Sequence, residues 1–256
     1  DVRRAGQVFV NDYNGNLIYK HAIDTISGNR MPYTLELVYN TNDMDLDIGY
    51  GKGMRLNYHQ QIGLKTIDGT QYYEWIDGTG TQHDSDTSNW LDELNQDIEL
   101  TIGTSVAEKY VISNKSEDKL IFNSGGLLVK IKDINDNALT ITYENNCIKT
   151  ITDGAGRILS VGFSGNKIMT VTNTEGHEKT FAIFNGYLVG IQDFDAKELS
   201  LEYTNGLLTS VENFDGYRMV YTYTGNPTRV ETVKEYVGGD SKRTLTVEYG
   251  CNINKF

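Results

Sequence analysis

Residues Asp193–Glu212, DFDAKELSLEYTNGLLTSVE, are one copy of the unit that decides the fold of this chain. Copies of this unit follow one another at intervals of 20 residues. Each opens with Asp or Asn in a turn-rich context, at Asp133, Asp153, Asn173, Asp193 and Asn213. Five phased copies indicate a repeat architecture, in which a unit buries its apolar face by stacking on its neighbours.

Each copy predicts a β-hairpin. Apolar side chains alternate in its first half, as in Leu199, Leu201 and Tyr203, which is typical of a strand with one buried face. The Asn205-Gly206 pair that follows reaches positive φ at low cost and predicts a tight turn. Equivalent strand residues are Leu139, Ile141 and Tyr143; Leu159, Val161 and Phe163; Phe181 and Ile183; and Met219, Tyr221 and Tyr223. Equivalent turns are Asn145-Asn146, Gly165-Asn166, Asn185-Gly186 and Gly225-Asn226.

The return strand of each hairpin carries two apolar residues three positions apart, a spacing that predicts a bulge or bend. The pairs are Ile148 and Ile151, Ile168 and Val171, Leu188 and Ile191, and Leu208 and Val211. Turn residues such as Asp153–Arg157 then start the next hairpin. We therefore predict an all-β fold of consecutive antiparallel hairpins that pair into one long, curling sheet.

The repeats divide the chain in two. Residues 1–110 are predicted to form a β-rich N-terminal region, and residues 111–256 the hairpin repeats, beginning with an imperfect copy at Leu120–Ile131. Leu245, Val247 and Tyr249 predict a further strand in an incomplete last repeat. Because exposed sheet edges are normally covered, we expect the native polypeptide to continue past Phe256.

Composition narrows the choice of partners. The 35 Asp and Glu outnumber the 23 Lys and Arg, and the net charge of −12 argues against binding to nucleic acid. No apolar run is long enough to predict a membrane span. The N-terminus, Asp1-Val2-Arg3-Arg4, lacks the apolar core of a signal peptide, so we expect any export signal to have been left out or removed. Cys147 and Cys251 are too sparse for a disulfide framework and are expected to be small side chains in strands.

The repeats resemble those of the Rhs or YD-repeat family. The stretch Tyr203–Gly216, YTNGLLTSVENFDG, is similar to the family unit Tyr-Asp-x-x-Gly-Arg-Leu-x-x-Ile-x-Asp-x-x-Gly, and Asp153–Arg157 fits its turn. The Asp of the motif is mostly replaced, by Glu144, Ser164, Thr204 and Thr224. These copies are therefore diverged.

The N-terminal region is similar to the segment that precedes the repeats in bacterial Rhs proteins. Its blocks appear in the same order, namely Gly15–Leu17, Asp24–Tyr33, Leu37–Asn40 and Gly49–Asn57, with Met54 where the family usually has Trp. This resemblance implies a non-catalytic scaffold with no cofactor, from a protein that is secreted or on the bacterial cell surface. In bacterial toxin complexes and teneurins such repeats coil into a hollow shell, which in the toxins encloses a C-terminal toxic domain. The implied partner is the remainder of the polypeptide, with further repeats and such a domain.

An alternative function is the binding of glycans or cell-surface proteins through exposed aromatic rings. Tyr72, Tyr73 and Trp75 lie between the turn signals Asp68-Gly69 and Asp77-Gly78, which predicts one aromatic strand of a hairpin. The polar stretch Asp84–Asp97, anchored by Trp90 and Leu91, predicts a long surface loop. Tyr72, Tyr73, Trp75 and Trp90 are the candidate ligand-binding residues.

Two loop patterns suggest other chemistry. Asp43, Asp45 and Asp47 alternate like the first ligands of a calcium loop, but Ile48 and Met54 stand where Gly and Glu are required, so we expect a solvated acidic loop, with weak calcium binding as the alternative. The stretch Gly49–Gly53 lacks the Ser or Thr of a phosphate-binding loop, so it is interpreted as a turn.

The histidines and acids also lack an active-site pattern. His83 with Asp84 and Asp86, and the dispersed His21, His59 and His177, lack the spacing of a metal site and are interpreted as isolated surface residues. A hydrolase remains a third class of function, which would require a concave pocket holding two acids with perturbed pKa values.

Overall fold

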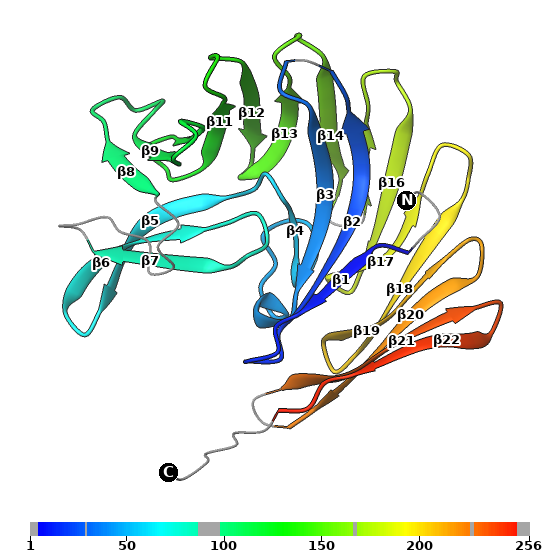
Figure 1. Ribbon diagram of the computed structural model, residues 1–256. Helices are drawn as coiled ribbons and strands as arrows, with labels where there is room; N and C mark the ends of the chain where they lie inside the picture. The colour runs from blue at the N-terminus through cyan, green and yellow to red at the C-terminus, as the bar shows by residue number, and fades with distance from the viewer. Residues whose placement is uncertain (1–4, 29, 87–97, 166–167, 226–227, 250–256) are drawn as a thin grey trace, which may run out of the picture.

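The computed structural model describes residues 5–28, 30–86, 98–165, 168–225 and 228–249. Within these ranges the fold is all-β, as predicted, with 22 strands in three antiparallel sheets and one short 3-10 helix, η1 (Thr41–Asp43). No helix in this part of the chain is both long and apolar enough to cross a membrane. Figure 1 shows the largest sheet as an open arc that curves around a smaller N-terminal sheet.

Two small sheets precede the arc. The N-terminal sheet, in chain order, contains β1 (Gln7–Val10), β2 (Leu17–Ile26), β3 (Tyr33–Asn40) and β4 (Met54–Leu56). The second contains β5 (Gln61–Ile67), β6 (Thr70–Ile76) and β7 (Gln82–Asp86). The aromatic strand is thus confirmed as β6. The surface loop predicted from Asp84 is wrong for Asp84–Asp86, because these residues pair with Tyr72–Glu74 of β6; the rest of that stretch, with Trp90, lies outside the described residues.

The long sheet has 15 strands in unbroken chain order and does not close into a barrel. Its first strand begins at Glu99, before residue 111, where the repeat region was predicted to start. Its strands are β8 (Glu99–Ile102), β9 (Tyr110–Ser113), β10 (Lys119–Phe122), β11 (Leu128–Lys132), β12 (Ala138–Glu144), β13 (Cys147–Thr152), β14 (Ile158–Ser164), β15 (Ile168–Thr172), β16 (Glu178–Phe184), β17 (Tyr187–Gln192), β18 (Glu198–Thr204), β19 (Leu207–Asn213), β20 (Tyr217–Thr224), β21 (Arg229–Val237) and β22 (Asp240–Thr246).

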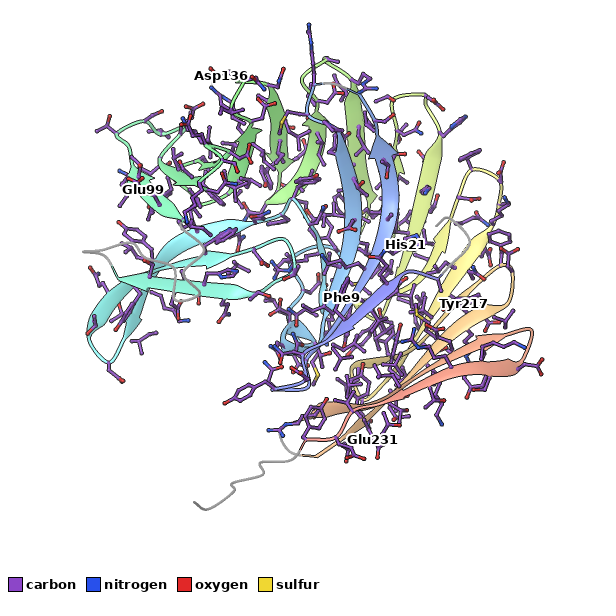
Figure 2. All side chains as sticks on the ribbon, viewed as in Figure 1. Phe9, His21, Glu99, Asp136, Tyr217 and Glu231 are labelled. Atoms are coloured by element: carbon purple, nitrogen blue, oxygen red, sulfur yellow. The ribbon has the colours of Figure 1, made fainter. Side chains whose placement is uncertain are left out.

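The Asp or Asn that opens each repeat builds the loop between hairpins. In Asp153, Oδ1 accepts hydrogen bonds from the backbone N–H groups of Ala155 at 3.0 Å and Arg157 at 2.8 Å. The same two bonds form at Asp133, Asn173, Asp193 and Asn213. Asp and Asn are interchangeable here because only the side-chain oxygen is used. Figure 2 shows Asp136 on the rim that these loops form.

The two-residue turns are also confirmed, at Asn145-Asn146, Asn185-Gly186 and Asn205-Gly206. Both residues of each turn have positive φ, which matches the right-handed twist of the strands they join. After these turns the register shifts, so the predicted bulge is present in β12–β13, β16–β17 and β18–β19.

The predicted bulge is wrong for hairpin β14–β15. There the ladder closes at Ser164 and Ile168 with no register shift, so the connection takes three residues where its neighbours take two. Strands β14 and β15 therefore pair without the extra residue that bulges in the neighbouring hairpins. Ile168 is therefore 40% exposed, whereas the equivalent Ile148, Leu188 and Leu208 are fully buried.

The last strand starts earlier than predicted. The turn into β22 falls at Gly238-Gly239, both with positive φ, and Leu245 lies near the end of the strand, opposite Val233. All seven residues of β22 are exposed, and no other described strand pairs with its outer edge.

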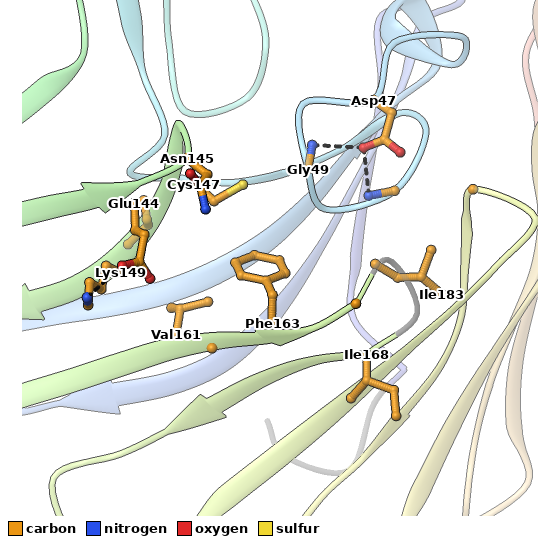
Figure 3. Close-up of a pocket in the computed structure, with 15 residues that line it drawn as sticks. Asp47, Gly49, Glu144, Asn145, Cys147, Lys149, Val161, Phe163, Ile168 and Ile183 are labelled. Carbon is orange, nitrogen blue, oxygen red and sulfur yellow. Dashed lines mark hydrogen bonds and ion pairs between the residues drawn. The ribbon is translucent and has the colours of Figure 1, made fainter.

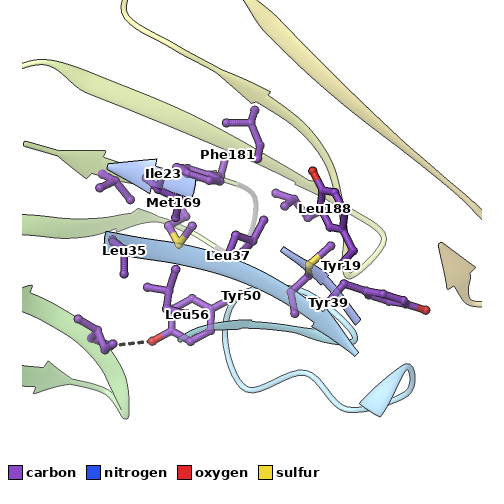
Figure 4. Packing of buried hydrophobic residues seen from close by; sticks show 14 of the residues in the cluster. Tyr19, Ile23, Leu35, Leu37, Tyr39, Tyr50, Leu56, Met169, Phe181 and Leu188 are labelled. Carbon is purple, nitrogen blue, oxygen red and sulfur yellow. Dashed lines mark hydrogen bonds between the residues drawn. The ribbon is translucent and has the colours of Figure 1, made fainter. Parts of the chain in front are cut away.

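The hydrophobic core lies between the N-terminal sheet and the inner face of the arc, the face turned toward β1–β4. Figure 4 shows Leu35, Leu37 and Tyr39 of β3 packed with Met169, Phe181 and Leu188 of the long sheet. As predicted, the repeat tyrosines Tyr143, Tyr203, Tyr221 and Tyr223 belong to this core or pack against it. The arc and the N-terminal sheet thus bury each other's apolar faces.

Candidate functional site

The most specific contacts in the molecule join the N-terminal segment to the bulges of the long sheet. A bulge interrupts the ladder and leaves a backbone group in need of another partner. Four such N–H groups donate to the N-terminal segment: Leu128 to Gln60 O (3.2 Å), Ile148 to Tyr50 Oη (2.8 Å), Leu208 to Tyr39 Oη (3.2 Å) and Val230 to Gly15 O (3.0 Å). We call these the bulge amides. The later an acceptor lies in the N-terminal segment, the earlier in the chain is the bulge amide that it binds. The N-terminal segment therefore runs along the arc in the direction opposite to the repeats.

Hairpin β16–β17 replaces this hydrogen bond with close packing. A Cβ on Gly51 would lie 3.1 Å from the amide nitrogen of Leu188, the equivalent bulge residue, and Gly51 has a φ of +98°. The Lys52 N–H donates to the Gly186 carbonyl at 2.7 Å. The loop Gly49–Gly53 is therefore a structural turn docked on this hairpin, as predicted from its sequence.

A row of tyrosines serves the carbonyls of the same bulge residues. Tyr143 donates to Leu128 O, Tyr223 to Leu208 O and Tyr249 to Val230 O, each at 2.7 Å. Tyr143 and Tyr223 thereby fasten their own hairpins to the preceding ones, and Tyr249, which follows β22, binds β21. Burial raises the pKa of Tyr143 and Tyr223, so these hydroxyls remain protonated donors. The hydroxyl gives a physical reason for the tyrosines Tyr143 and Tyr223, whereas the buried hydroxyl of Tyr203 at the same repeat position makes no such bond within the described residues.

Lys179 occupies a position of the repeat that is otherwise filled by core residues. The sequence patterns did not single it out as a functional residue. Its equivalents in the other repeats are Leu139, Leu159, Leu199 and Met219, all buried. Its ammonium group donates to the carbonyl of Ile23, the residue skipped in the pairing of β2 with β3. Burial lowers the pKa of Lys179, which Asp24 and Asp193 partly offset. A lysine at a repeat position that is otherwise apolar is the sequence signal that could have identified this contact.

The loop Asp153–Arg157 holds the turn between β2 and β3. Arg157 donates to Asp153 through Nε at 2.7 Å and to the Ser27 carbonyl through Nη2 at 2.8 Å. Asp153 is only 3% exposed. Its burial raises the carboxyl pKa, but the hydrogen bonds from Arg157 and Ala155 outweigh this and lower the pKa below its usual value. This ion pair therefore ties one repeat loop to the N-terminal sheet.

His59 is buried at the contact between the two sheets, contrary to the prediction of an isolated surface residue. It is 1% exposed, and its Nδ1 lies 2.9 Å from Tyr50 Oη. Burial, reinforced by the positive charge of Arg55, lowers its pKa to about 4. His21 is half-buried, and burial together with Lys179 lowers its pKa to about 4 as well. Both are thus neutral near pH 7.

A groove of about 760 Å³ lies beside the loop Gly49–Gly53 (Figure 3). Phe163, Ile168 and Ile183 line it, and Phe163 remains 41% exposed. The groove follows from the missing bulge of hairpin β14–β15, which leaves these side chains uncovered. Cys147, the free thiol at its wall, has its pKa raised by burial and by Asp47, so the thiol is protonated and poorly nucleophilic.

The predicted aromatic residues do not form one platform. Tyr73 and Trp75 share one face of β6, and Tyr72 lies on the other, because side chains alternate along a strand. Tyr73 packs edge-on against Tyr110 at 5.9 Å. Trp75 stacks on His83 at 4.7 Å and donates to Gln60 Oε1 at 3.0 Å. Trp90 lies outside the described residues.

The three acids of the candidate calcium loop are engaged separately or exposed. Asp43 binds Arg55 at 2.8 Å, and Asp47 accepts the N–H groups of Gly49 and Gly51. Asp45 is exposed. Among the described residues, no group of three or more His, Cys, Asp or Glu side chains is placed to hold a metal ion.

The remaining histidines belong to local contacts. His83 lies 3.2 Å from Asp77 Oδ2, while the neighbouring Asp84 lies 3.5 Å from Lys65 on the other face of the strand. His177 stacks on Phe194 with ring centroids 4.2 Å apart and contacts Glu175 at 3.4 Å. The residues His83, Asp84 and His177 are therefore not brought together.

No family model matches the chain, and no curated protein matches its sequence.

Proposed function

We propose that this chain is a non-catalytic structural scaffold, a wall segment of an Rhs-type shell in a large secreted or bacterial cell-surface protein. The observation that carries the proposal is the repeated use of three structural features that shape the hairpins and hold them in place. These are the Asp or Asn loop, the bulge amide and the tyrosine that joins one hairpin to the preceding one. The polar groups of all three features bind other groups of the same chain.

The wall would grow by pairing of further hairpins with the outer edge of β22, where the N–H and C=O groups of a sheet edge form a template for another strand. Its partner is then the remainder of the same polypeptide, and a toxin domain is the cargo that this type of shell would enclose. No cofactor is required, and the carboxylates described above serve loops and ion pairs.

The test is the intact mass and C-terminal sequence of the protein purified from its natural source. Additional sequence that keeps the 20-residue phase would support the wall segment. A natural product that ends near Phe256 would contradict it and would favour the second candidate function.

That second candidate is a binding module for glycans or cell-surface proteins, built on the sheet β5–β7. This sheet extends away from β1–β4 below β8 and β9 (Figure 1), and Leu64 on it is 56% exposed beside half-exposed Tyr73. Glycans that stack on this face should change the fluorescence of Trp75, and the change should disappear in the Trp75→Phe variant. Unaltered fluorescence across a glycan panel would argue against this use of the face.

A further inference from the structure

His59 is enclosed between the N-terminal segment and the long sheet. It follows β4, its ring lies edge-on to Tyr50 with centroids 5.4 Å apart, and its other side meets Tyr143 of β12 at 5.6 Å. It is therefore the only described histidine that is fully buried and in ring contact with the long sheet as well as with the N-terminal segment.

Contacts at both ring nitrogens involve the neutral form of this histidine in docking. The Ile148 N–H donates to Tyr50 Oη at 2.8 Å, and the same oxygen lies 2.9 Å from His59 Nδ1, with the tautomer of the ring deciding which of these two atoms donates. On the other side of the ring, His59 Nε2 lies 3.4 Å from Gln61 Nε2, an amide nitrogen that can only donate. A neutral imidazole has one ring nitrogen that accepts and one that donates, whereas an imidazolium has two donors and no acceptor.

The charged surroundings of His59 oppose a second proton. Arg55, on β4, is the charged group that acts on it, and Arg55 is 4% exposed. The carboxylate of Asp43, the last residue of η1, is already bound to Arg55 at 2.8 Å. On the long-sheet side the titratable neighbour is Tyr143, and on the loop it is Tyr50; burial raises the pKa of both, so they stay neutral.

We propose that His59 is an acid-sensitive latch: its protonation disrupts the contacts of the neutral ring with Tyr50 and Gln61 and releases the loop Gly49–Gly53 from hairpin β12–β13. A second proton makes both ring nitrogens donors, so the group that donates to the neutral ring loses its acceptor in a buried setting. It also adds a positive charge beside Arg55. Both effects favour the released loop, in which the imidazolium is hydrated.

The latch is local because the bulge amides of Leu208 and Val230 donate to groups that do not titrate in acid. Leu208 donates to Tyr39 Oη in the same way that Ile148 donates to Tyr50 Oη, but none of the described histidines is hydrogen-bonded to Tyr39. Val230 donates to the backbone of Gly15. These two bulge amides therefore serve as internal controls within one molecule. His21, beside Lys179, is the second acid-sensitive group of the interface.

The test is amide hydrogen exchange of the full chain, with protection factors of Ile148 and Leu208 compared at pH 7, 5 and 4. With a folded pKa of about 4 and a released pKa of 6.5, opening at Ile148 should increase about 20-fold at pH 5 and about 120-fold at pH 4 relative to pH 7. Protection of Leu208 should stay nearly constant. A parallel loss at both amides, or no loss at Ile148 by pH 4, would overturn the proposal.

Two variants and one titration complete the test. His59→Asn keeps an oxygen acceptor for Tyr50 but takes up no proton, so protection of Ile148 should become independent of pH. His177→Asn, the same change at a histidine that contacts Glu175 and Phe194, should leave the wild-type response intact. An NMR titration of the wild-type His59 ring must give a pKa well below 6.5; a normal value contradicts the latch even if His59→Asn fails to fold.

Discussion

Tyr223→Phe tests whether the tyrosine row fastens one hairpin to the next. The hydroxyl of Tyr223 donates to the carbonyl of Leu208 at 2.7 Å in the core, so its removal deprives a buried acceptor of this donor. Loss of one partner of a buried hydrogen bond costs about 1–3 kcal/mol. For a chain of this size a cost of about 2 kcal/mol lowers Tm by roughly 4–8 °C.

The matched control lies two residues earlier on the same face of β20. Tyr221 is 1% exposed, and its hydroxyl has no hydrogen-bond partner among the described residues. Because a buried hydroxyl without a partner is unfavourable, Tyr221→Phe should leave stability unchanged or raise it by up to about 1 kcal/mol. Calorimetry and urea unfolding of both variants measure the difference. Equal destabilisation by the two substitutions would refute the role of the tyrosine hydroxyl as a tie between hairpins.

Two further predictions concern the loops between hairpins. Ala196, with a φ of 60°, occupies the left-handed position that Gly156, with a φ of 80°, fills in another repeat. Ala196→Gly should therefore raise stability by about 0.5–1 kcal/mol and Gly156→Ala should lower it, as thermal unfolding would show; the opposite order would contradict this reading. Asp153→Asn keeps the loop acceptor but removes the charge that faces Arg157. Since the pKa of Asp153 is lowered on folding, the advantage of the wild type over Asp153→Asn should be present above its usual value of 3.8 and vanish in urea titrations as the pH falls below it.

The hairpin repeats could be predicted because their signals are local. An Asp or Asn every 20 residues, a turn pair such as Asn205-Gly206 and alternating apolar residues each act on neighbouring backbone, so the sequence carries them directly. The exception at β14–β15 shows the limit of such reasoning. Moving one residue from a bulge to a turn leaves the repeat length unchanged, and only the register around Ser164 and Ile168 reveals it.

The interface between the two sheets could not be predicted, because most of it addresses backbone atoms far away in the chain. Any residue could supply the carbonyl of Gly15 that receives the Val230 N–H. His59 and Tyr50 lie nine residues apart and meet only when the loop between them folds back. Among these contacts, only that of Lys179 has a signal in the sequence, namely a charged residue at a repeat position that is otherwise apolar.

The four bulge amides also couple the length of the N-terminal segment to the number of repeats between Leu128 and Val230. The acceptors from Gly15 to Gln60 match the amides from Val230 back to Leu128, so the spacing of the acceptors must equal the spacing of the amides along the arc. Duplication of a 20-residue unit inserts two strands, which shifts everything beyond it by roughly 10 Å. Inside the measured interval such a duplication would misalign every later contact, whereas beyond Val230 it would leave all four in place. Growth of the repeat array by duplication is therefore tolerated at one end of the arc and resisted within it.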